Sequence, residues 1–314
     1  MDFEVILYIL IGIGIFFALP STIYTFMFLG VFLKRKVLMI EKDDTKNTHY
    51  HPFQEQMKKD ILQARELPCE KVTIKAQDGV SLVARYYDRS SSKTIMFVHG
   101  YQTNAFNNFS TALIDFLNQG YNVLLIDQRA HGDSGGKFTT LGCKEKNDLQ
   151  LWIDYIDKKE EVKSIIIYGI SMGATTVGYA AENIKTSKVK GLIMEAGFTC
   201  FYEELDSSLG RIFMRQAALN YVYLTSKSVL KIDIKKSIEP SLKNNEIPVL
   251  FLHGDSDEEV PIEFTERCYD ACASEKETFI VKGAGHTLCY IVGGQSVKEK
   301  INEFIGKCID KGDK

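Results

Sequence analysis

The sequence lacks an excess of basic residues, since 38 Lys and Arg stand against 41 Asp and Glu in its 314 residues. The formal net charge of −3 leaves no positive surface to neutralise phosphates, which argues against a nucleic-acid partner. Prolines are few, at six, while 45% of the residues are hydrophobic and 25% are charged. This composition excludes a disordered chain and a collagen-like fibre, and it suits one large domain or two small ones.

Cysteine pairs at C-x-x-C spacing are missing as well. Seven cysteines, an odd number, are dispersed along the chain, which argues against a secreted disulfide scaffold and favours a reducing compartment. Cys268 and Cys272 lie one helical turn apart, a spacing that two metal ligands can have. Because no second pair or histidine cluster accompanies them, we interpret both as half-buried thiols.

Charged residues are absent from Val5 to Leu33, and about 20 apolar residues suffice to cross a bilayer as a helix. The halves on either side of Pro20 are each too short to span alone, so we expect one kinked or tilted helix. A cleaved signal peptide fits poorly. Its first residues should be basic, whereas Asp2 and Glu4 are acidic, and no small-residue cleavage site follows the apolar core.

The basic run Lys34-Arg35-Lys36 follows directly, and flanking basic residues tend to stay on the cytoplasmic side. We therefore expect a single-pass protein of the cell membrane whose folded body faces the cytoplasm. Residues 1–36 form the predicted transmembrane anchor and basic flank. Residues 37–70, which are polar with a weak helical stripe around Met57, form a predicted tether and short helix.

Short apolar runs recur from residue 71 onward. Two alternating runs flank the turn signal Asp78-Gly79 and predict an opening hairpin. Three further runs, at 94–98, 121–126 and 164–168, suit strands buried on both faces of a parallel sheet, and three later runs are further strand candidates. The predicted strands cover residues 72–75, 81–86, 94–98, 121–126, 164–168, 189–194, 248–252 and 278–281, with helix-length segments at 109–119 and 144–158. This alternation predicts a doubly wound, mostly parallel α/β sheet with functional residues at the carboxyl ends of its strands.

Residues 198–240 interrupt the alternation. This block has no clear strand and is rich in aromatic and long aliphatic residues, among them Phe201, Tyr202, Phe213 and Tyr221. We interpret it as a helical cap insertion that covers the strand ends. A longer crossover connection is the alternative.

A serine between glycines follows the strand predicted at 164–168, in Gly169-Ile170-Ser171-Met172-Gly173, and helix-compatible residues come next. This is a G-x-S-x-G motif in strand-turn-helix context. The strained turn presents the serine hydroxyl and leaves room only for glycine two residues to either side. We therefore predict Ser171 as a nucleophile.

A serine hydroxyl needs a base to remove its proton, and the pKa of histidine suits that task. His286 follows the last predicted strand on the glycine-rich loop Gly283-Ala284-Gly285, from which an imidazole can reach Ser171, and it is the predicted base. The alternative is a loop histidine bonded to backbone. The other five histidines end strands or lie in the tether and a turn: His49, His51, His99, His131 and His253.

The imidazole must in turn be oriented by a carboxylate. Four acids compete in the segment after the strand at 248–252, and Glu195, which ends the sixth strand, is a further rival. The four are Asp255, Asp257, Glu258 and Glu259.

From about residue 70 to 310 the chain resembles the α/β-hydrolases, in particular bacterial single-domain hydrolases with an amino-terminal membrane anchor. Five motifs in the order of that family carry the resemblance: His99-Gly100-Tyr101, Asp127 to Ser134, Gly169 to Gly173, His253-Gly254-x-x-Asp257-x-x-Val260-Pro261 and Gly285-His286. The resemblance implies the α/β-hydrolase fold and selects Asp257, three residues before Val260, as the acid. The order Ser171, Asp257, His286 is also that of the family.

An oxyanion hole needs two backbone N–H donors aimed at the developing negative charge. Met172, the residue after the nucleophile, is expected to supply one, and the resemblance implies that Tyr101 supplies the other. We interpret His99 and the segment from Asp127 to Ser134 as loop scaffolding, with a metal site at His131 and Asp133 as the minor alternative.

These residues predict a serine hydrolase that cleaves carboxylic esters through an acyl-enzyme and uses no metal or organic cofactor. Residues 71–314 are the predicted catalytic domain, and its oligomeric state does not follow from the sequence. The aromatic cap and the membrane anchor together point to a small-molecule ester with an apolar acyl group. The alternatives are an amidase or peptidase with the same triad, and a membrane-tethered binding protein without turnover.

Overall fold

The computed structural model describes residues 22–34, 50–210 and 214–312. Its centre is an eight-stranded sheet with the order β1-β2-β4-β3-β5-β6-β7-β8. The strands are Glu70–Lys75 (β1), Ser81–Tyr87 (β2), Lys93–Val98 (β3), Asn122–Asp127 (β4), Ser164–Ile170 (β5), Val189–Glu195 (β6), Val249–Gly254 (β7) and Lys276–Val281 (β8).

Strand pairing confirms the predicted α/β sheet. β1 pairs with β2 and β2 with β4 in antiparallel register, and all later pairs are parallel. Each predicted run forms a strand, and the opening hairpin is present. Every residue of β4 and β5 is buried, as expected for strands covered on both faces.

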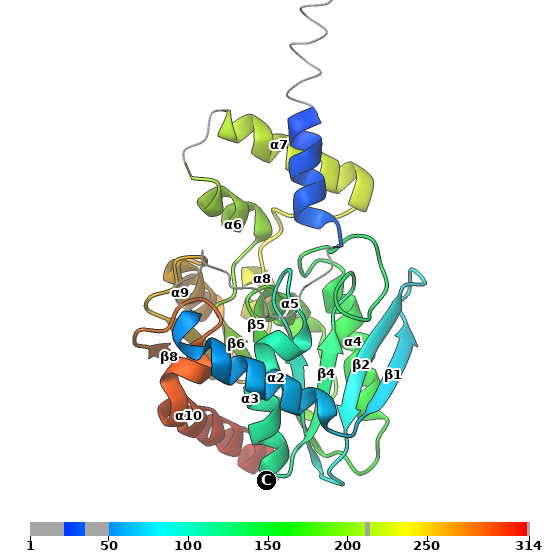
Figure 1. Ribbon diagram of the computed structural model, residues 1–314, viewed down its shortest axis with the longest axis vertical. Helices are drawn as coiled ribbons and strands as arrows, with labels where there is room; N and C mark the ends of the chain where they lie inside the picture. The colour runs from blue at the N-terminus through cyan, green and yellow to red at the C-terminus, as the bar shows by residue number, and fades with distance from the viewer. Residues whose placement is uncertain (1–21, 35–49, 211–213, 313–314) are drawn as a thin grey trace, which may run out of the picture.

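Helices cover both faces of the sheet (Figure 1). Cores on the two faces contain side chains of α2, α3 and α10 on one side and of α4, α5, α8 and α9 on the other. Helix α3 begins before the predicted residue 109 because the Asn104 side chain accepts the Asn107 N–H at 3.0 Å and caps it. The helices are Gln54–Glu66 (α2), Ala105–Asn118 (α3), Glu145–Asp157 (α4), Met172–Ala180 (α5), Glu239–Lys243 (α8), Ile262–Ala271 (α9) and Cys289–Gly312 (α10).

Three short helical turns complete these layers: His51–Phe53 (η1), Ala181–Asn183 (η2) and the π-helical Ser226–Leu230 (η3). Helix α10 is kinked at Gly294, whose φ is +51°. Turn η1 and helix α2 lie in the predicted tether, as the weak apolar stripe indicated, whereas residues 37–49 of that tether lie outside the described residues.

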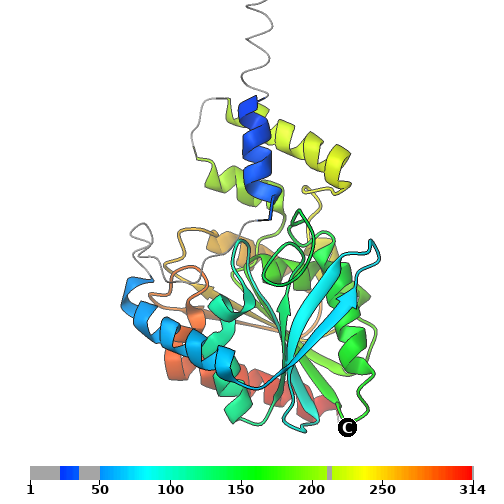
Figure 2. The ribbon, with the colours of Figure 1, turned by 45° about the vertical axis from the view of Figure 1, so that its right-hand side comes forward.

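The predicted insertion at 198–240 contains Phe201–Ser208 (α6), Arg215–Thr225 (α7), η3 and the start of α8. A third apolar cluster joins this cap to the catalytic face, through residues that include Phe198, Phe201, Leu219 and Met172. Figure 2 shows α6 and α7 standing over the edge of the sheet.

Residues 22–32 form a helix that lies beside α7 in both views (Figure 1; Figure 2). The rings of Tyr24 and Tyr221 are 5.6 Å apart, and the Thr25 hydroxyl lies 2.6 Å from that of Tyr221. Phe28 and Phe32 are buried in the cap cluster. This part of the predicted membrane run therefore packs against protein, because the cap offers it an apolar partner.

The rest of the predicted anchor, residues 1–21, lies outside the described residues, as do Arg35 and Lys36. Within the part of the chain that the structure describes, no helix combines the length and the apolar character needed to cross a bilayer.

Candidate active site

Ser171 occupies a strained turn between β5 and α5. Its backbone has φ +53° and ψ −119°, a conformation that costs free energy and is retained at functional sites. A Cβ atom on Gly169 would lie 2.5 Å from the Gly173 carbonyl oxygen, and one on Gly173 would lie 1.9 Å from that of Val98. Both contacts are too short for any side chain, so the two glycines are a steric condition for this turn.

Ser171, His286 and Asp257 form one series of hydrogen bonds. His286 Nε2 lies 3.0 Å from Ser171 Oγ, and His286 Nδ1 lies 2.8 Å from Asp257 Oδ2. Asp257 Oδ1 accepts the backbone N–H groups of Glu259 and Val260, both at 2.9 Å. These two donors orient the carboxylate so that its other oxygen is available to the imidazole.

The electrostatics of this series favour a basic imidazole and an ionised carboxylate. Burial lowers the pKa of His286, but the hydrogen bond and charge of Asp257 outweigh this and raise it above its ordinary value. Burial likewise raises the pKa of Asp257, and the hydrogen bond and charge of His286 reverse that to a net lowering. At neutral pH Asp257 is therefore ionised.

The register of the sheet brings together the loops that follow β7 and β8. β7 and β8 are parallel with Gly254 opposite Val281, so the segments after both strands leave the same edge. Asp255 Oδ1 accepts the Gly283 N–H at 2.6 Å and joins these segments. Asp255 is thus a loop anchor, and it is Asp257 that contacts the imidazole.

Glu195, the other rival acid, is fully buried. It accepts hydrogen bonds from the Tyr168 hydroxyl and, at 3.0 Å, from the Cys289 N–H. Burial raises its pKa. These contacts tie β5 and β6 to the start of α10, so Glu195 supports the segment that follows His286.

The segment predicted to hold the second oxyanion donor passes beside the nucleophile. A Cβ atom on Gly100 would lie 3.4 Å from Ser171 Cβ, and Tyr101 and Ser171 line the same pocket. Met172 opens α5 immediately after Ser171. The Tyr101 hydroxyl donates to the Val31 carbonyl at 2.6 Å, so the helix at residues 22–32 buttresses this segment.

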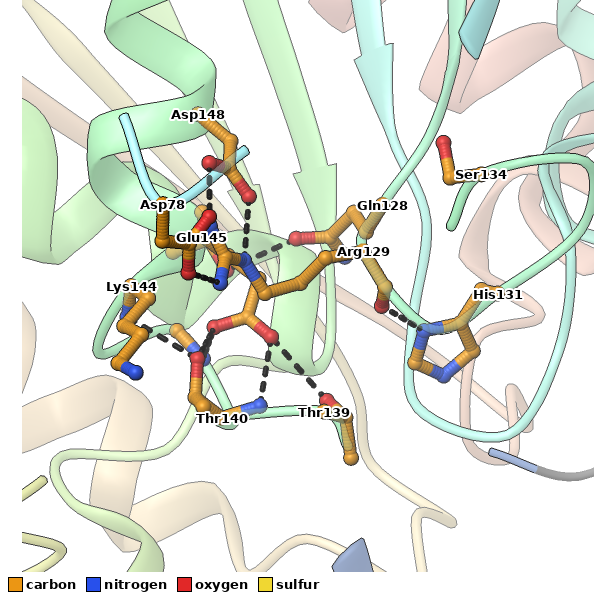
Figure 3. A network of polar contacts seen from close by, with 12 residues as sticks. Asp78, Gln128, Arg129, His131, Ser134, Thr139, Thr140, Lys144, Glu145 and Asp148 are labelled. Carbon is orange, nitrogen blue, oxygen red and sulfur yellow. Dashed lines mark hydrogen bonds and ion pairs between the residues drawn. The ribbon is translucent and has the colours of Figure 1, made fainter. Parts of the chain in front are cut away.

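The motif from Asp127 to Ser134 is a structural loop, as the sequence indicated. Arg129 donates through Nε and Nη2 to both oxygens of Asp148, at 2.6 and 2.7 Å, and through Nη1 to Asp78 at 2.8 Å (Figure 3). His131 Nδ1 lies 2.9 Å from the Arg129 carbonyl oxygen, and its Nε2 accepts the Gln102 N–H at 3.1 Å. The bond from the Gln102 N–H joins this loop to the backbone that follows Tyr101.

A pocket of about 660 Å³ contains Ser171 and His286. Part of its lining is apolar and comes from Val31, Leu141, Phe198, Phe201, Leu205 and Val260. Its polar lining includes residues that the sequence did not reveal, Tyr50 and Glu204. Tyr50 lies in the predicted tether and Glu204 in helix α6 of the cap. Neither belongs to a sequence motif that would have identified it as a pocket residue.

A larger hollow of about 950 Å³ lies at the amino-terminal ends of β6, β7 and β8. It contains none of the predicted site residues, and it has no base or nucleophile aligned as in the Ser171 pocket, which we take as the candidate site. No group of three or more His, Cys, Asp and Glu side chains in the described residues is placed to hold a metal ion. Cys268 and Cys272 are buried free thiols.

Comparison with known proteins gives a family. A family model described as serine aminopeptidase, S33 matches residues 89–231, and one described as TAP-like protein matches residues 225–309. Together they cover the sheet from the start of β3 and the cap. The fold and these matches define a hydrolase, and the chain belongs to the α/β-hydrolase superfamily.

Among individual relatives, the chain is 29% identical to the uncharacterized protein YqkD of Bacillus subtilis over 224 residues, which cover 69% of this chain and 72% of that protein. It is 26% identical to the lysophosphatidylserine lipase ABHD12 of Danio rerio over 203 residues, or 62% of this chain and 51% of that protein.

Solved structures show the same fold. The Pyrococcus furiosus esterase Pf2001 superposes with a TM-score of 0.64 at 25% identity, covering 80% of this chain and 93% of that one. Est1E of Butyrivibrio proteoclasticus, solved with ferulic acid bound, has a TM-score of 0.61 at 24% identity, with 76% and 99% covered.

Proposed function

We propose that the protein is a serine hydrolase that cleaves carboxylic esters, with Ser171 as nucleophile, His286 as general base and Asp257 as the acid that orients it. The observation that carries this proposal is the unbroken series from Ser171 Oγ to His286 Nε2, at 3.0 Å, and from His286 Nδ1 to Asp257 Oδ2, at 2.8 Å. Both distances are within the reach required of a nucleophile and its base.

In the proposed reaction, Ser171 Oγ attacks the ester carbonyl carbon while its proton passes to His286 Nε2. Asp257 stabilises the resulting imidazolium. The tetrahedral intermediate collapses, the C–O bond to the alcohol breaks, and the departing oxygen takes the proton from His286. A water molecule then attacks the acyl-enzyme with His286 again as base, which releases the acid and restores Ser171. This chemistry requires no metal or organic cofactor.

The backbone N–H groups of Tyr101 and Met172 are the proposed oxyanion donors. The close approach of Gly100 to Ser171 and the position of Met172 at the first residue of α5 support this assignment, because N–H groups in the first turn of a helix have no partner within that helix. The loss of one such donor typically lowers kcat by about 100- to 1,000-fold.

The proposed substrate is a small-molecule ester with an apolar acyl group. Support comes from the apolar pocket wall formed by Leu141, Phe198, Phe201 and Leu205. Superposition on the esterase Pf2001 is consistent with this choice. A nucleic-acid substrate is not proposed, given the net charge of −3.

Amide or peptide hydrolysis is the second candidate function, and the family model described as serine aminopeptidase favours it. Matched ester and amide substrates with the same acyl group separate the two. The third candidate function is that of a protein that binds its ligand without turnover.

A fluorophosphonate probe tests the chemistry directly. We expect wild-type protein to be labelled at Ser171, and labelling to be absent from Ser171→Ala and strongly slowed in His286→Ala. Hydrolysis of short p-nitrophenyl esters should fall by at least about 10⁴-fold in Ser171→Ala. Wild-type rates in Ser171→Ala would remove Ser171 from the mechanism, and no labelling of the wild type would favour the binding function.

A membrane attachment is also proposed, with the uncharged amino-terminal run anchored in the cell membrane and the catalytic domain in the cytoplasm. Residues 5–21, which precede the helix that packs on the cap, carry no charge. Six of the eight exposed large hydrophobic side chains of the described residues lie in the segment that follows this run in the sequence or in the cap: Ile23, Phe26, Leu33, Met214, Leu224 and Val229. Such a concentration is typical of a membrane-facing surface.

Deletion of residues 1–21 tests this attachment. We expect the shortened chain to lose its partition into membranes while it keeps hydrolysis of a water-soluble ester, because Phe28, Val31 and Phe32 remain. Unchanged partition would contradict the anchor. Deletion through residue 34 is the comparison. It should lower the melting temperature, because Phe28 and Phe32 are buried in the cap cluster, and it should lower turnover, because Val31 lines the pocket.

A further inference from the structure

Glu204 is a carboxylate of the catalytic pocket that the proposed reaction does not use. It lies in α6, the first helix of the cap, and it lines the pocket with Ser171 and His286. Its Oε1 accepts the hydroxyl of Ser208 at 3.0 Å. Its Oε2 is buried and has no hydrogen-bond partner among the described residues. A buried carboxylate oxygen without a donor is costly, which points to a donor that arrives with a ligand.

Apart from His286, the titratable side chains that could carry charge at neutral pH and line the pocket are acidic. Glu204, Glu258 and Glu259 line it, and no Lys or Arg of the described residues does. Glu258 and Glu259 are exposed on the loop after Asp257, where water screens them, whereas Glu204 is partly enclosed by the cap. An anionic group entering this pocket would meet repulsion, and a cation would meet attraction.

The surroundings of Glu204 also disfavour a second negative charge in the pocket. Burial raises the pKa of Glu204 to about 7; the hydrogen bond from Ser208 and the charge of His286 oppose this rise, and the charges of Asp257 and Glu259 add to it. A cationic ligand would offset the cost of ionising this carboxyl, so that binding and ionisation support one another.

The free oxygen also limits the shape of the cation. Because Ser208 already donates to Oε1, only Oε2 is without a donor, which suits a compact ammonium that acts as a point donor. A guanidinium, by contrast, prefers to engage both oxygens of a carboxylate.

We propose that Glu204 binds a primary ammonium group of the substrate, so that the preferred ester combines an apolar part with an ammonium. This inference rests on the proposed ester hydrolysis and specifies its substrate class. The ammonium belongs to either the acyl half or the alcohol half of the ester, and two pairs of isosteric substrates distinguish these sources.

The first pair is methyl 6-aminohexanoate and methyl heptanoate, which differ in an ammonium on the acyl side. The second is 6-aminohexyl butyrate and heptyl butyrate, which differ in an ammonium on the alcohol side. Turnover is followed by titration of the released acid at pH 8, above the pKa of about 7 of Glu204. In one pair we expect wild-type kcat/KM for the ammonium ester to exceed that of its neutral partner by at least about tenfold, the size of a charge-assisted hydrogen bond.

Glu204→Gln is the test variant and Glu203→Gln its matched control. Glu203 is the neighbouring residue of the same helix, but its Oε2 accepts from Arg267 at 2.6 Å and from Thr199 at 2.7 Å, and it does not line the pocket. We expect Glu204→Gln to reduce the preference, the ratio of kcat/KM for the ammonium ester to kcat/KM for its neutral partner, to about one. Glu203→Gln should keep the preference. Thermal unfolding checks that both variants are folded.

Calorimetric titration with hexylammonium chloride gives a readout that does not need turnover. Binding at least about tenfold weaker in Glu204→Gln than in wild type and Glu203→Gln supports the inference. Absence of any ammonium preference together with equal hexylammonium binding in all three proteins would overturn it, even if neutral esters are hydrolysed and the proposed function stands. Failure to hydrolyse any ester would reject the proposed function, and the titration would then decide the ammonium site alone.

Discussion

The hydroxyl of Tyr50 donates to the carbonyl oxygen of His286 at 3.2 Å and lies 2.7 Å from the hydroxyl of Thr287. Thr287 has a φ of +60°, a left-handed conformation that a β-branched residue adopts only at a cost. Burial is the main cause that raises the pKa of Tyr50 to about 12, so its hydroxyl stays protonated and able to donate. Tyr50 therefore positions the His286 loop from outside the catalytic domain predicted from the sequence.

Removal of this hydroxyl in Tyr50→Phe should lower kcat by about fivefold, the equivalent of one hydrogen bond, and leave KM nearly unchanged. Steady-state kinetics on a neutral ester checks this. Tyr87→Phe is the control, because that hydroxyl donates at 3.4 Å to Ala64, away from the pocket. A Tyr50→Phe enzyme with wild-type kcat would show that the loop holds His286 without Tyr50.

Replacement of the orienting acid should be far more damaging than replacement of its rival. In Asp257→Asn we expect kcat to fall by about 10⁴-fold, because the amide no longer selects the correct tautomer or stabilises the imidazolium. Asp255→Asn, which only weakens the bonds that Asp255 Oδ1 accepts from the Gly283 N–H and the Ser256 hydroxyl, should cost less than about tenfold. The opposite ranking in kinetic assays would make Asp255 the acid.

The pH profile follows from the raised pKa of His286. The base must be neutral, so kcat/KM should rise with pH and its inflection should lie above about 6.5, the ordinary value for histidine. In Asp257→Asn the burial of the imidazole, which lowers the pKa of His286, becomes the dominant cause, and the inflection should move to lower pH. The charged groups around this imidazole are Asp257, Glu259 and Glu204. The profile is therefore measured in the Glu204→Gln background too, so that Glu204 is not mistaken for the base.

The raised pKa of His286 should affect stability in the opposite direction to activity as the pH rises. A raised pKa in the folded state stabilises the fold fully below the unfolded value, and this contribution is lost as pH rises through the raised pKa. Activity should therefore increase over the pH interval in which the contribution of protonated His286 to unfolding free energy disappears. Urea unfolding of wild type and His286→Gln between pH 5 and 9 measures that difference, and a difference that grows with pH would contradict the assignment.

Two glycine substitutions should change the unfolding free energy in opposite directions. Gly173→Ala would place a Cβ 1.9 Å from the Val98 carbonyl oxygen, so we expect severe destabilisation, roughly 3 kcal/mol or more, from overpacking against backbone. Gly306 lies within α10 with nothing within 4 Å of an added Cβ. Gly306→Ala should therefore raise stability by about 0.5 to 1 kcal/mol. Thermal unfolding measures both, and a stable, active Gly173→Ala protein would refute the described turn.

Two phenylalanines of the helix at residues 22–32 should behave differently. Phe32 is 0% exposed and Phe26 is 70% exposed. Phe32→Ala should cost about 3 to 5 kcal/mol of unfolding free energy through the cavity it leaves, and Phe26→Ala should change it by less than about 0.5 kcal/mol. Equal effects in chemical denaturation would show that this helix does not dock on the cap in solution.

The order of strands and helices was predictable because it depends on local pattern. Runs such as Ile165 to Tyr168 are buried on both faces and must be apolar, so they are visible in the sequence. The turn at Ser171 was predictable for a similar reason, since Gly169 and Gly173 satisfy a steric condition that no other residue meets. Five motifs in family order added Asp257 and Tyr101, which the residue pattern alone left among alternatives.

Tertiary structure decided the features that depend on contacts between distant segments. Phe28 and Phe32 are as hydrophobic as the residues of a membrane helix, yet they pack on the cap. Apolar side chains are stabilised by removal from water whether they are buried against protein or in lipid, so the sequence does not distinguish the two. Tyr50 and Glu204 belong to no motif, and each gains its position only when the tether and the cap close over the loops of β5, β7 and β8. The turn at Ser171 and the strands thus depend on local sequence, whereas the shape and charge of the pocket depend on packing between elements that are far apart in the chain.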